Sequence, residues 1–185
     1  AKRPKTSVQY TESRPENQRI TPKGFDLHCA LLFLKGMILP IDIVLPRLAN
    51  ALGQKRNVVL SAPPGAGKTT RVPLALLEEP WMTGKKLIML EPRRLAARRA
   101  AQFMAAQLGQ QAGETVGYRT RGDSRVGKNT RIEVVTEGVL TRLLHGQNEL
   151  PDVALVIFDE FHERSIHADL GLAFTLDVQQ NLRED

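Results

Sequence analysis

The sequence predicts an α/β domain of three layers, in which helices cover both faces of a mostly parallel central sheet. Short apolar runs alternate with helical patterns from residue 57 to residue 182, and such alternation is typical of parallel strands joined by crossover helices. The first apolar run leads directly into a glycine-rich loop and a helix. The chain has 185 residues, enough for one domain with a substantial core.

The expected elements follow from these patterns in order. Strands are expected at 57–61, 86–90, 115–119, 131–136 and 154–158, because each is a short apolar run bounded by polar or turn residues. Helices are expected at 41–51, 68–77, 95–108, 137–145 and 165–182, where apolar residues recur at helical spacing. Residues 121–129 contain Gly122, Gly127 and Asn129 and are expected to form a loop.

Residues 1–36 stand apart in composition. Residues 1–26 are rich in Lys, Arg, Pro, Ser, Thr, Gln and Glu, so we expect a disordered extension, followed at 27–36 by a short, loosely attached helix. The segment 1–36 carries seven Lys or Arg against three acids, and a basic arm that contacts nucleic acid is the alternative. The domain is therefore expected to span residues 37–185.

Charge and cysteine content limit the class of protein. A formal net charge of +6 suits an anionic partner such as nucleic acid, and it suits ordinary solubility equally well. Cys29 is the single cysteine, which excludes an internal disulfide and favours a cytoplasmic location. No apolar run approaches the length of a membrane span, and no signal peptide is apparent, so we expect no membrane partner.

The stretch NVVLSAPPGAGKTT at residues 57–70 has the layout of a phosphate-binding P-loop: strand, glycine loop, Gly-Lys-Thr and helix. Gly65 and Gly67 let successive N–H groups point into one concavity, and the helix start adds positive charge. Lys68 suits the β- and γ-phosphates of ATP, and the Thr69 hydroxyl suits Mg²⁺. The residues expected to bind the nucleotide are Pro64, Gly65, Ala66, Gly67, Lys68, Thr69 and Thr70. Ala62 replaces the first glycine of the pattern, and a simple glycine turn before a helix is the alternative.

The apolar strand at 154–158 delivers Asp159 and Glu160 at its carboxyl end. In a parallel sheet, ligands bind at that end, where the P-loop also leaves its strand. Both acids are candidate Mg²⁺ ligands, since adjacent carboxylates at a buried strand end need a cation, and Glu160 would polarise the attacking water. An acidic helix start is the alternative. His162 and His167 are five residues apart and face different sides of a helix, which argues against a zinc site.

Five ordered stretches resemble the DEAH-box helicases of superfamily 2. They are the P-loop (motif I), EPRRLAAR at 91–98 (motif Ia), VGYR at 116–119, TEGVL at 136–140 (motif Ib) and DEFHERS at 159–165, where Phe161 stands in place of the family's Ala. Within the family, residues 91–98 and Phe161 are most similar to the bacterial HrpB group of ATP-dependent RNA helicases. The resemblance covers about residues 37–185 and implies a P-loop NTPase fold, namely the first RecA-like domain of a longer enzyme.

The resemblance implies further roles for individual residues. Phosphates along a single nucleic-acid strand, RNA in preference to DNA, would be contacted by Arg93, Arg94, Thr136 and Gly138. A solvated helix start is the alternative for the two arginines. His162 would couple the γ-phosphate of the nucleotide to the rest of the helicase. Phe103 stands where the family often places an arginine on adenine, and we interpret it as a core residue, with stacking on the base as the alternative.

The resemblance also defines what this stretch of sequence would not supply. Motif III and a second RecA-like domain with arginine fingers would follow Asp185, so that domain is an expected partner and this chain alone should hydrolyse ATP slowly or not at all. A different P-loop enzyme, such as a transport or kinase ATPase, is an alternative function. It is disfavoured because those enzymes lack the Pro-Arg-Arg and Thr-Glu-Gly stretches between the two nucleotide motifs. A non-catalytic nucleic-acid-binding module is disfavoured by intact Lys68, Thr69, Asp159 and Glu160. The sequence does not decide RNA against DNA, the substrate or the direction of movement.

Overall fold

The computed structural model describes residues 6–9, 39–146 and 150–183, which divide into two compact units after Val72. The helix expected at 27–36 and the domain start expected at Met37 lie outside these residues. The division falls inside helix α3 (Lys68–Leu76). Each unit is described by itself below.

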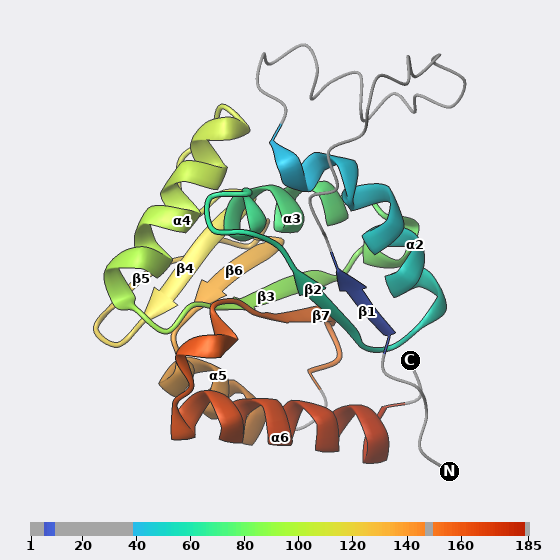
Figure 1. Ribbon diagram of the computed structural model, residues 1–185. Coiled ribbons are helices and arrows are strands. Elements are labelled where there is room, and N and C mark those ends of the chain that lie inside the picture. The colour runs from blue at the N-terminus through green and yellow to red at the C-terminus, as the bar shows by residue number, and fades with distance from the viewer. Residues whose placement is uncertain (1–5, 10–38, 147–149, 184–185) are drawn as a thin grey trace, which may run out of the picture. The chain divides into compact units, whose positions relative to one another are not determined.

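The first unit contains a two-stranded parallel sheet. Strand β2 (Val58–Ser61) pairs with β1 (Thr6–Gln9), so the expectation of disorder is wrong for these four N-terminal residues (Figure 1). The residues of β2 alternate between half-buried and exposed, and Val59 is 58% exposed, so this apolar run is not a fully buried strand.

The helix expected at 41–51 is divided in two. A short 3-10 helix, η1 (Pro40–Ile43), precedes α2 (Leu45–Gln54). Pro46 lies in the first turn of α2, where its missing N–H costs nothing, so it starts a new helix and does not continue the previous one. The buried residues of this pair are Ile41, Val44, Leu45 and Leu48.

The second unit is built on a five-stranded sheet in the order β5-β4-β6-β3-β7. The strands are β3 (Lys86–Leu90), β4 (Val116–Thr120), β5 (Asp123–Arg125), β6 (Ile132–Val135) and β7 (Val153–Phe158). All neighbours are parallel except β4 and β5. The mostly parallel α/β sheet that the sequence predicts is confirmed.

Strand β5 replaces part of the loop expected at 121–129. It returns against β4 after the two residues Arg121 and Gly122, and Gly122 has a φ of +83°, which a glycine adopts without strain. The close approach depends on Gly117, because a Cβ there would lie 2.4 Å from the Arg125 carbonyl oxygen. The polar sequence Asp-Ser-Arg carries no apolar alternation, so the pattern of the chain gave no sign of this strand.

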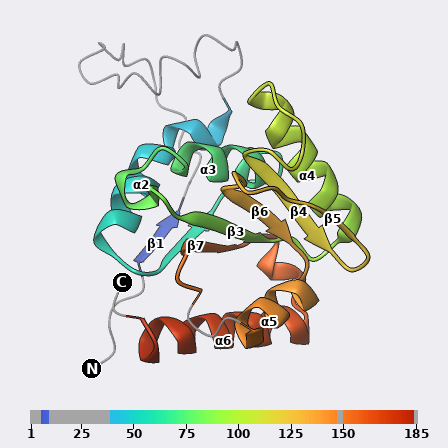
Figure 2. The same ribbon diagram turned by 180° about the vertical axis from the view of Figure 1, so that it is seen from behind.

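Helices cover both faces of the five-stranded sheet, which gives three layers (Figures 1 and 2). Helix α4 (Arg94–Gln107) covers one face, and α5 (Glu137–Gly146) and α6 (Ile166–Asn181) cover the other. Side chains of β3 alternate between the two cores, as expected for a strand that is buried on both sides. The α4-side core includes Leu87, Met89, Ala101, Met104, Val116, Tyr118, Ile132 and Val134. The opposite core includes Ile88, Leu90, Val135, Leu140, Leu144, Ala168 and Val178.

A corner of the α4-side core is closed by the short helix η2 (Pro80–Met82). Trp81 packs against this core from η2, and Met82 is fully buried. The guanidinium of Arg131 donates hydrogen bonds to the carbonyl oxygens of Leu77 (3.2 Å) and Met82 (2.8 Å). One side chain from the segment before β6 therefore holds both ends of this corner.

A buried carboxylate bridges three strands of the sheet. The side chain of Glu133 on β6 is 6% exposed, and its two oxygens accept from Arg119 Nε on β4 (2.7 Å) and Lys86 Nζ on β3 (3.4 Å). The two cations are about two-fifths exposed, so only the carboxylate is fully removed from water. The two cations therefore compensate the cost of removing this carboxylate from water.

Replacing Glu133 by Gln should lower the free energy of unfolding by about 1–3 kcal/mol, because the amide has a single acceptor oxygen: one cation loses its hydrogen bond and both lose an ionic partner. The measurement is the urea midpoint of the whole chain by circular dichroism. The matched control is Glu78→Gln, which removes the same charge from an exposed position and should leave the midpoint unchanged. Equal midpoints for all three proteins would contradict a stabilising role for the bridge.

Candidate functional site

The glycine loop of the first unit connects β2 to α3 and holds a positive charge against its backbone. The Lys68 ammonium donates to the carbonyl oxygens of Ala62 (2.9 Å) and Pro63 (3.2 Å). Helix α3 begins at Lys68, as predicted, so the positive end of the helix dipole adds to the lysine charge. Pro64 and Gly65 are exposed, and Lys68, Thr69 and Thr70 are half-buried. An anion is the ligand that this arrangement favours.

Two glycines give the loop its curvature. Gly65 has a φ of +76° and Gly67 a φ of +96°, both in the region that side chains disfavour. The site of a Cβ on Gly65 is open, whereas a Cβ on Gly67 would lie 2.6 Å from Leu39 Cδ1 and 3.2 Å from Ile41 Cγ2. Ala62, which replaces the first glycine of the P-loop pattern, does not have a positive φ. That departure therefore introduces no strain into the loop.

Helix η1 packs directly on the loop. The Ile41 N–H donates to the carbonyl oxygen of Ala66 (3.3 Å), and Ala66 is 3% exposed. The Asp42 carboxylate accepts from the Leu39 N–H (2.8 Å) and lies 4.0 Å from Arg71 Nε in the first turns of α3. These contacts fix the segment that presses on Gly67.

In the second unit, the predicted site residues Asp159 and Thr136 lie in one row with Glu91 at the carboxyl edge of the sheet. The strand ladders continue by one hydrogen bond past each strand end: Glu91 N–H to Val135 O (2.9 Å), Asp159 N–H to Leu90 O (3.1 Å) and Thr136 N–H to Arg119 O (3.3 Å). The residues after β3, β7 and β6 are thereby held at the same level of the sheet. Parallel sheets bind their ligands at this edge.

The acidic residues after β7 form a tight, strained turn. Glu160 has φ +49° and ψ +30°, a left-handed conformation that is rare outside glycine and frequent at functional sites. Its N–H donates to Asp159 Oδ1 (3.0 Å), and its carbonyl oxygen accepts from the Glu163 N–H (2.9 Å). The short helix η3 (Phe161–Glu163) follows, and His162 Nε2 lies 3.3 Å from Glu160 Oε2. Asp159, Glu160 and His162 are therefore brought together.

Glu91 is a buried acid beside this turn, and sequence reasoning gave it no role. It is 4% exposed. Burial raises the pKa of the Glu91 carboxyl; the hydrogen bond from the Arg93 N–H (3.2 Å) opposes the rise, and the carboxylates of Asp159, Glu160 and Glu163 add to it. The available signal was a charged residue directly after the apolar strand KLIML.

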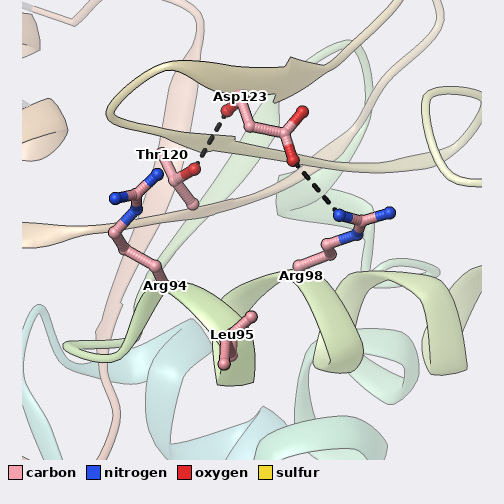
Figure 3. Close-up of a pocket in the computed structure, with 5 residues that line it drawn as sticks. All are labelled: Arg94, Leu95, Arg98, Thr120 and Asp123. Carbon is pink, nitrogen blue, oxygen red and sulfur yellow. Dashed lines mark hydrogen bonds and ion pairs between the residues drawn. The ribbon is translucent and has the colours of Figure 1, made fainter.

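The two arginines after β3 contact different partners. Arg93 Nη2 lies 2.5 Å from Glu163 Oε1, and Arg94 Nη2 donates to the Arg121 carbonyl oxygen (2.7 Å). Arg94 also lines a shallow pocket of about 340 Å³ with Leu95, Arg98, Thr120 and Asp123 (Figure 3). Within it, Arg98 pairs with the Asp123 carboxylate at 3.6 Å. Both predicted arginines are exposed at the start of α4.

The other predicted nucleic-acid contacts lie at the start of α5. Thr136 is 8% exposed, and its carbonyl oxygen accepts from the N–H groups of Val139 (2.9 Å) and Leu140 (3.1 Å). Gly138 is exposed, and a Cβ there would meet nothing within 4 Å. Its backbone is therefore accessible to a large anion.

Comparison with known proteins gives this geometry a family. The profile described as "DEAD/DEAH box helicase" matches residues 45–170, more than half of the chain. The chain belongs to the DEAD/DEAH box helicase family. The loop after β2 and the acids after β7 belong to two of the five stretches whose sequence resembles this family.

Relatives within the family agree in sequence and in fold. The chain is 59% identical over 147 residues to "ATP-dependent RNA helicase HrpB" of Escherichia coli K12, covering 80% of this chain and 18% of that protein. "ATP-dependent RNA helicase HrpA" of Borreliella burgdorferi is 32% identical, again covering 80% of this chain and 18% of that protein. A crystal structure of the Escherichia coli DEAH/RHA helicase HrpB matches with a TM-score of 0.76 and 58% identity, covering 80% of this chain and 19% of that one. The chain thus spans less than a fifth of these relatives, and its RecA-like fold is shown.

Outside the motifs of the family, one interpretation is wrong. The sequence predicts Phe103 to be a core residue, but its side chain is 55% exposed on α4, because the neighbouring Met104 and Ala105 take the buried positions of that turn. His145 lies in α5 with its ring against Phe174 (5.1 Å between centroids), and His167 lies in α6. Among residues 6–9, 39–146 and 150–183, no group of three His, Cys, Asp or Glu side chains could hold a metal ion.

The loop geometry predicts different costs for two glycine substitutions. Gly65→Ala should lower stability by about 1–2 kcal/mol, the cost of a left-handed conformation alone. Gly67→Ala should cost about 1–3 kcal/mol more, because its Cβ must also displace Leu39 and Ile41. Urea unfolding of both variants followed by circular dichroism provides the comparison. Equal losses would show that the segment 39–41 does not press on the loop in solution.

The environment of Glu91 predicts a pH dependence. Since its pKa is raised above 4.5 by folding, the folded chain binds more protons than the unfolded chain as pH rises from that value, and stability falls across this window. Glu91→Gln keeps an acceptor for the Arg93 N–H but does not titrate. Its free energy of unfolding relative to the wild type should therefore increase from acidic to neutral pH. A difference that is constant with pH, or that shrinks, would contradict the assignment.

Proposed function

We propose that this chain is the ATP-binding part of an ATP-dependent RNA helicase, which couples ATP hydrolysis to movement on single-stranded RNA. The observation that carries the proposal is the loop of the first unit, whose two left-handed glycines precede a lysine at a helix start. Both relatives described above are named ATP-dependent RNA helicases, which supports the same function.

The residues of the loop suit a nucleoside triphosphate. Lys68 would exchange its two carbonyl partners for phosphate oxygens, which are stronger acceptors because they are charged. The N–H groups of the loop and of the first turn of α3 would bind further phosphate oxygens. The nucleotide would thus be held by Pro64, Gly65, Ala66, Gly67, Lys68, Thr69 and Thr70.

The residues proposed for the chemistry are Lys68, Asp159, Glu160 and His162. Mg²⁺, held by the Thr69 hydroxyl and by Asp159 and Glu160, would neutralise charge on the phosphates. This donor set fits the ion, since Mg²⁺ favours oxygen ligands and takes one or two carboxylates with phosphates and water. The Glu160 carboxylate would orient the attacking water. His162, whose Nε2 lies 3.3 Å from Glu160 Oε2, would couple the γ-phosphate to the rest of the helicase.

The strand of RNA would contact the second unit through Arg93, Arg94, Thr136 and Gly138. Guanidinium groups and the backbone at the start of α5 bind phosphates and not bases, so little sequence preference is expected. A second RecA-like domain in the full-length protein would supply arginine fingers, and this chain alone should turn ATP over slowly.

The location of the protein is a separate matter. A cytoplasmic location stays a prediction that rests on the single Cys29. Across the part of the chain that the structure describes, no helix combines the length and the apolar character that a membrane crossing requires.

Lys68→Ala should weaken binding of Mg-ATP about 10- to 100-fold, because a charge-assisted contact to phosphate is lost. Isothermal titration calorimetry on the whole chain measures the affinity. Lys55→Ala is the matched control, since it removes an equal charge from an exposed position at the end of α2, and it should bind as the wild type does. If both variants bind equally well, the loop is not the nucleotide site.

A further inference from the structure

One ion pair in the second unit joins two segments that are 70 residues apart. Arg93 Nη2 at the start of α4 lies 2.5 Å from Glu163 Oε1 at the end of η3. The Arg93 side chain is 70% exposed and that of Glu163 is 33% exposed. Arg93 is among the residues proposed to contact RNA, and Glu163 follows the residues proposed for the chemistry. The inference below therefore rests on the proposed function.

The backbone of Arg93 is held by hydrogen bonds on both sides, whereas its side chain is held only by the exposed ion pair with Glu163. Its N–H donates to the buried Glu91 carboxylate (3.2 Å), and its carbonyl oxygen accepts from the Ala97 N–H (2.9 Å). The exposed guanidinium can therefore change partner by side-chain rotation alone. Arg94 differs, since its guanidinium donates to the neutral carbonyl oxygen of Arg121.

A phosphate cannot approach Arg93 in its present position without an electrostatic cost. Glu163 lies within hydrogen-bonding distance of the guanidinium. The carboxylates of Glu163, Asp159 and Glu160 all lie near enough to buried Glu91 to raise the pKa of its carboxyl, so several negative charges gather here. A strand of RNA carries a negative charge on every nucleotide and would be repelled by this group of acids. Arg93 can approach an RNA phosphate closely only by moving away from Glu163.

We propose that Glu163 competes with RNA phosphates for Arg93, so that Arg93 leaves Glu163 when a single strand binds. Glu163 is then a positioning residue that holds the RNA-contacting arginine against the acidic turn in the absence of RNA. An exposed ion pair is weak enough to be displaced, because such pairs change an equilibrium by only a few-fold.

The exchange of Glu163 for an RNA phosphate at Arg93 would also affect Glu160. The Glu163 N–H donates to the Glu160 carbonyl oxygen (2.9 Å), across the three residues of η3, and Glu160 is held in its left-handed conformation. Release of the Glu163 side chain removes one of the contacts that hold this turn. Occupation of Arg93 by RNA is thereby linked to the carboxylate proposed to orient the water.

The test is a double-mutant cycle on the full chain, with fluorescence anisotropy of a labelled, mixed-sequence single-stranded RNA at low salt and without nucleotide. Glu163→Gln should tighten binding about two- to fivefold, because Arg93 no longer has to leave a carboxylate. In the Arg93→Ala background, Glu163→Gln should have no such effect. Raising the salt concentration should reduce the gain, since exposed charges are screened.

The outcomes separate this inference from the proposed function. If Arg93→Ala leaves RNA binding unchanged, the proposed RNA contact at Arg93 is wrong. If Arg93→Ala weakens binding but Glu163→Gln weakens it too or leaves it unchanged, the contact holds and the competition is wrong. If Glu163→Gln tightens binding equally in both backgrounds, the effect is general removal of negative charge and the competition is again wrong. Circular dichroism of each variant confirms that it is folded.

Discussion

The second unit depends on the parallel register of β3 with its two neighbours. Leu90 is paired with Val135 on β6 and with Phe158 on β7, so the residues that follow, Glu91, Thr136 and Asp159, must leave the sheet at the same level. A shift of one residue in any strand would exchange its core-facing and opposite-facing side chains, and the two hydrophobic cores oppose this. The packing of the two hydrophobic cores on either face of the sheet therefore fixes the position of the candidate site residues at the sheet edge.

The acids gathered at this edge are tolerated because each has an identifiable partner. Asp159 accepts from the N–H of Glu160, and Glu91 accepts from the N–H of Arg93. Glu163 pairs with the Arg93 guanidinium, and Glu160 Oε2 lies 3.3 Å from His162 Nε2. The left-handed conformation of Glu160 is maintained by hydrogen bonds on both of its sides. Serine at position 165 completes the segment, since its hydroxyl donates to Glu137 and accepts from the Ala168 N–H, which caps α6.

The parts of the structure that could be predicted from the sequence are those with a local physical cause. Strand β3 and the start of α3 follow from an apolar run and from Gly-Lys-Thr. Strand β5 could not be predicted, because its pairing depends on space left by Gly117, a contact between residues that no periodicity reveals. The exposure of Phe103 and the burial of Glu91 likewise depend on tertiary packing, which overrides the preference of the individual residue. The motif residues were found because their chemistry fixes their spacing, whereas the role inferred for Glu163 depends on its ion pair with Arg93, which only the structure reveals.

The position of Trp81 has a spectroscopic consequence. It is the single tryptophan of the sequence and packs against the α4-side core of the second unit. Its emission therefore reports the surroundings of that unit, while far-ultraviolet dichroism reports the helices of both. Transitions that coincide by the two signals would show that the units lose their structure together, and separate transitions would show that they are independent cooperative bodies. Native fluorescence thus provides an optical probe of the second unit without a label, whereas the glycine loop lies in the first unit.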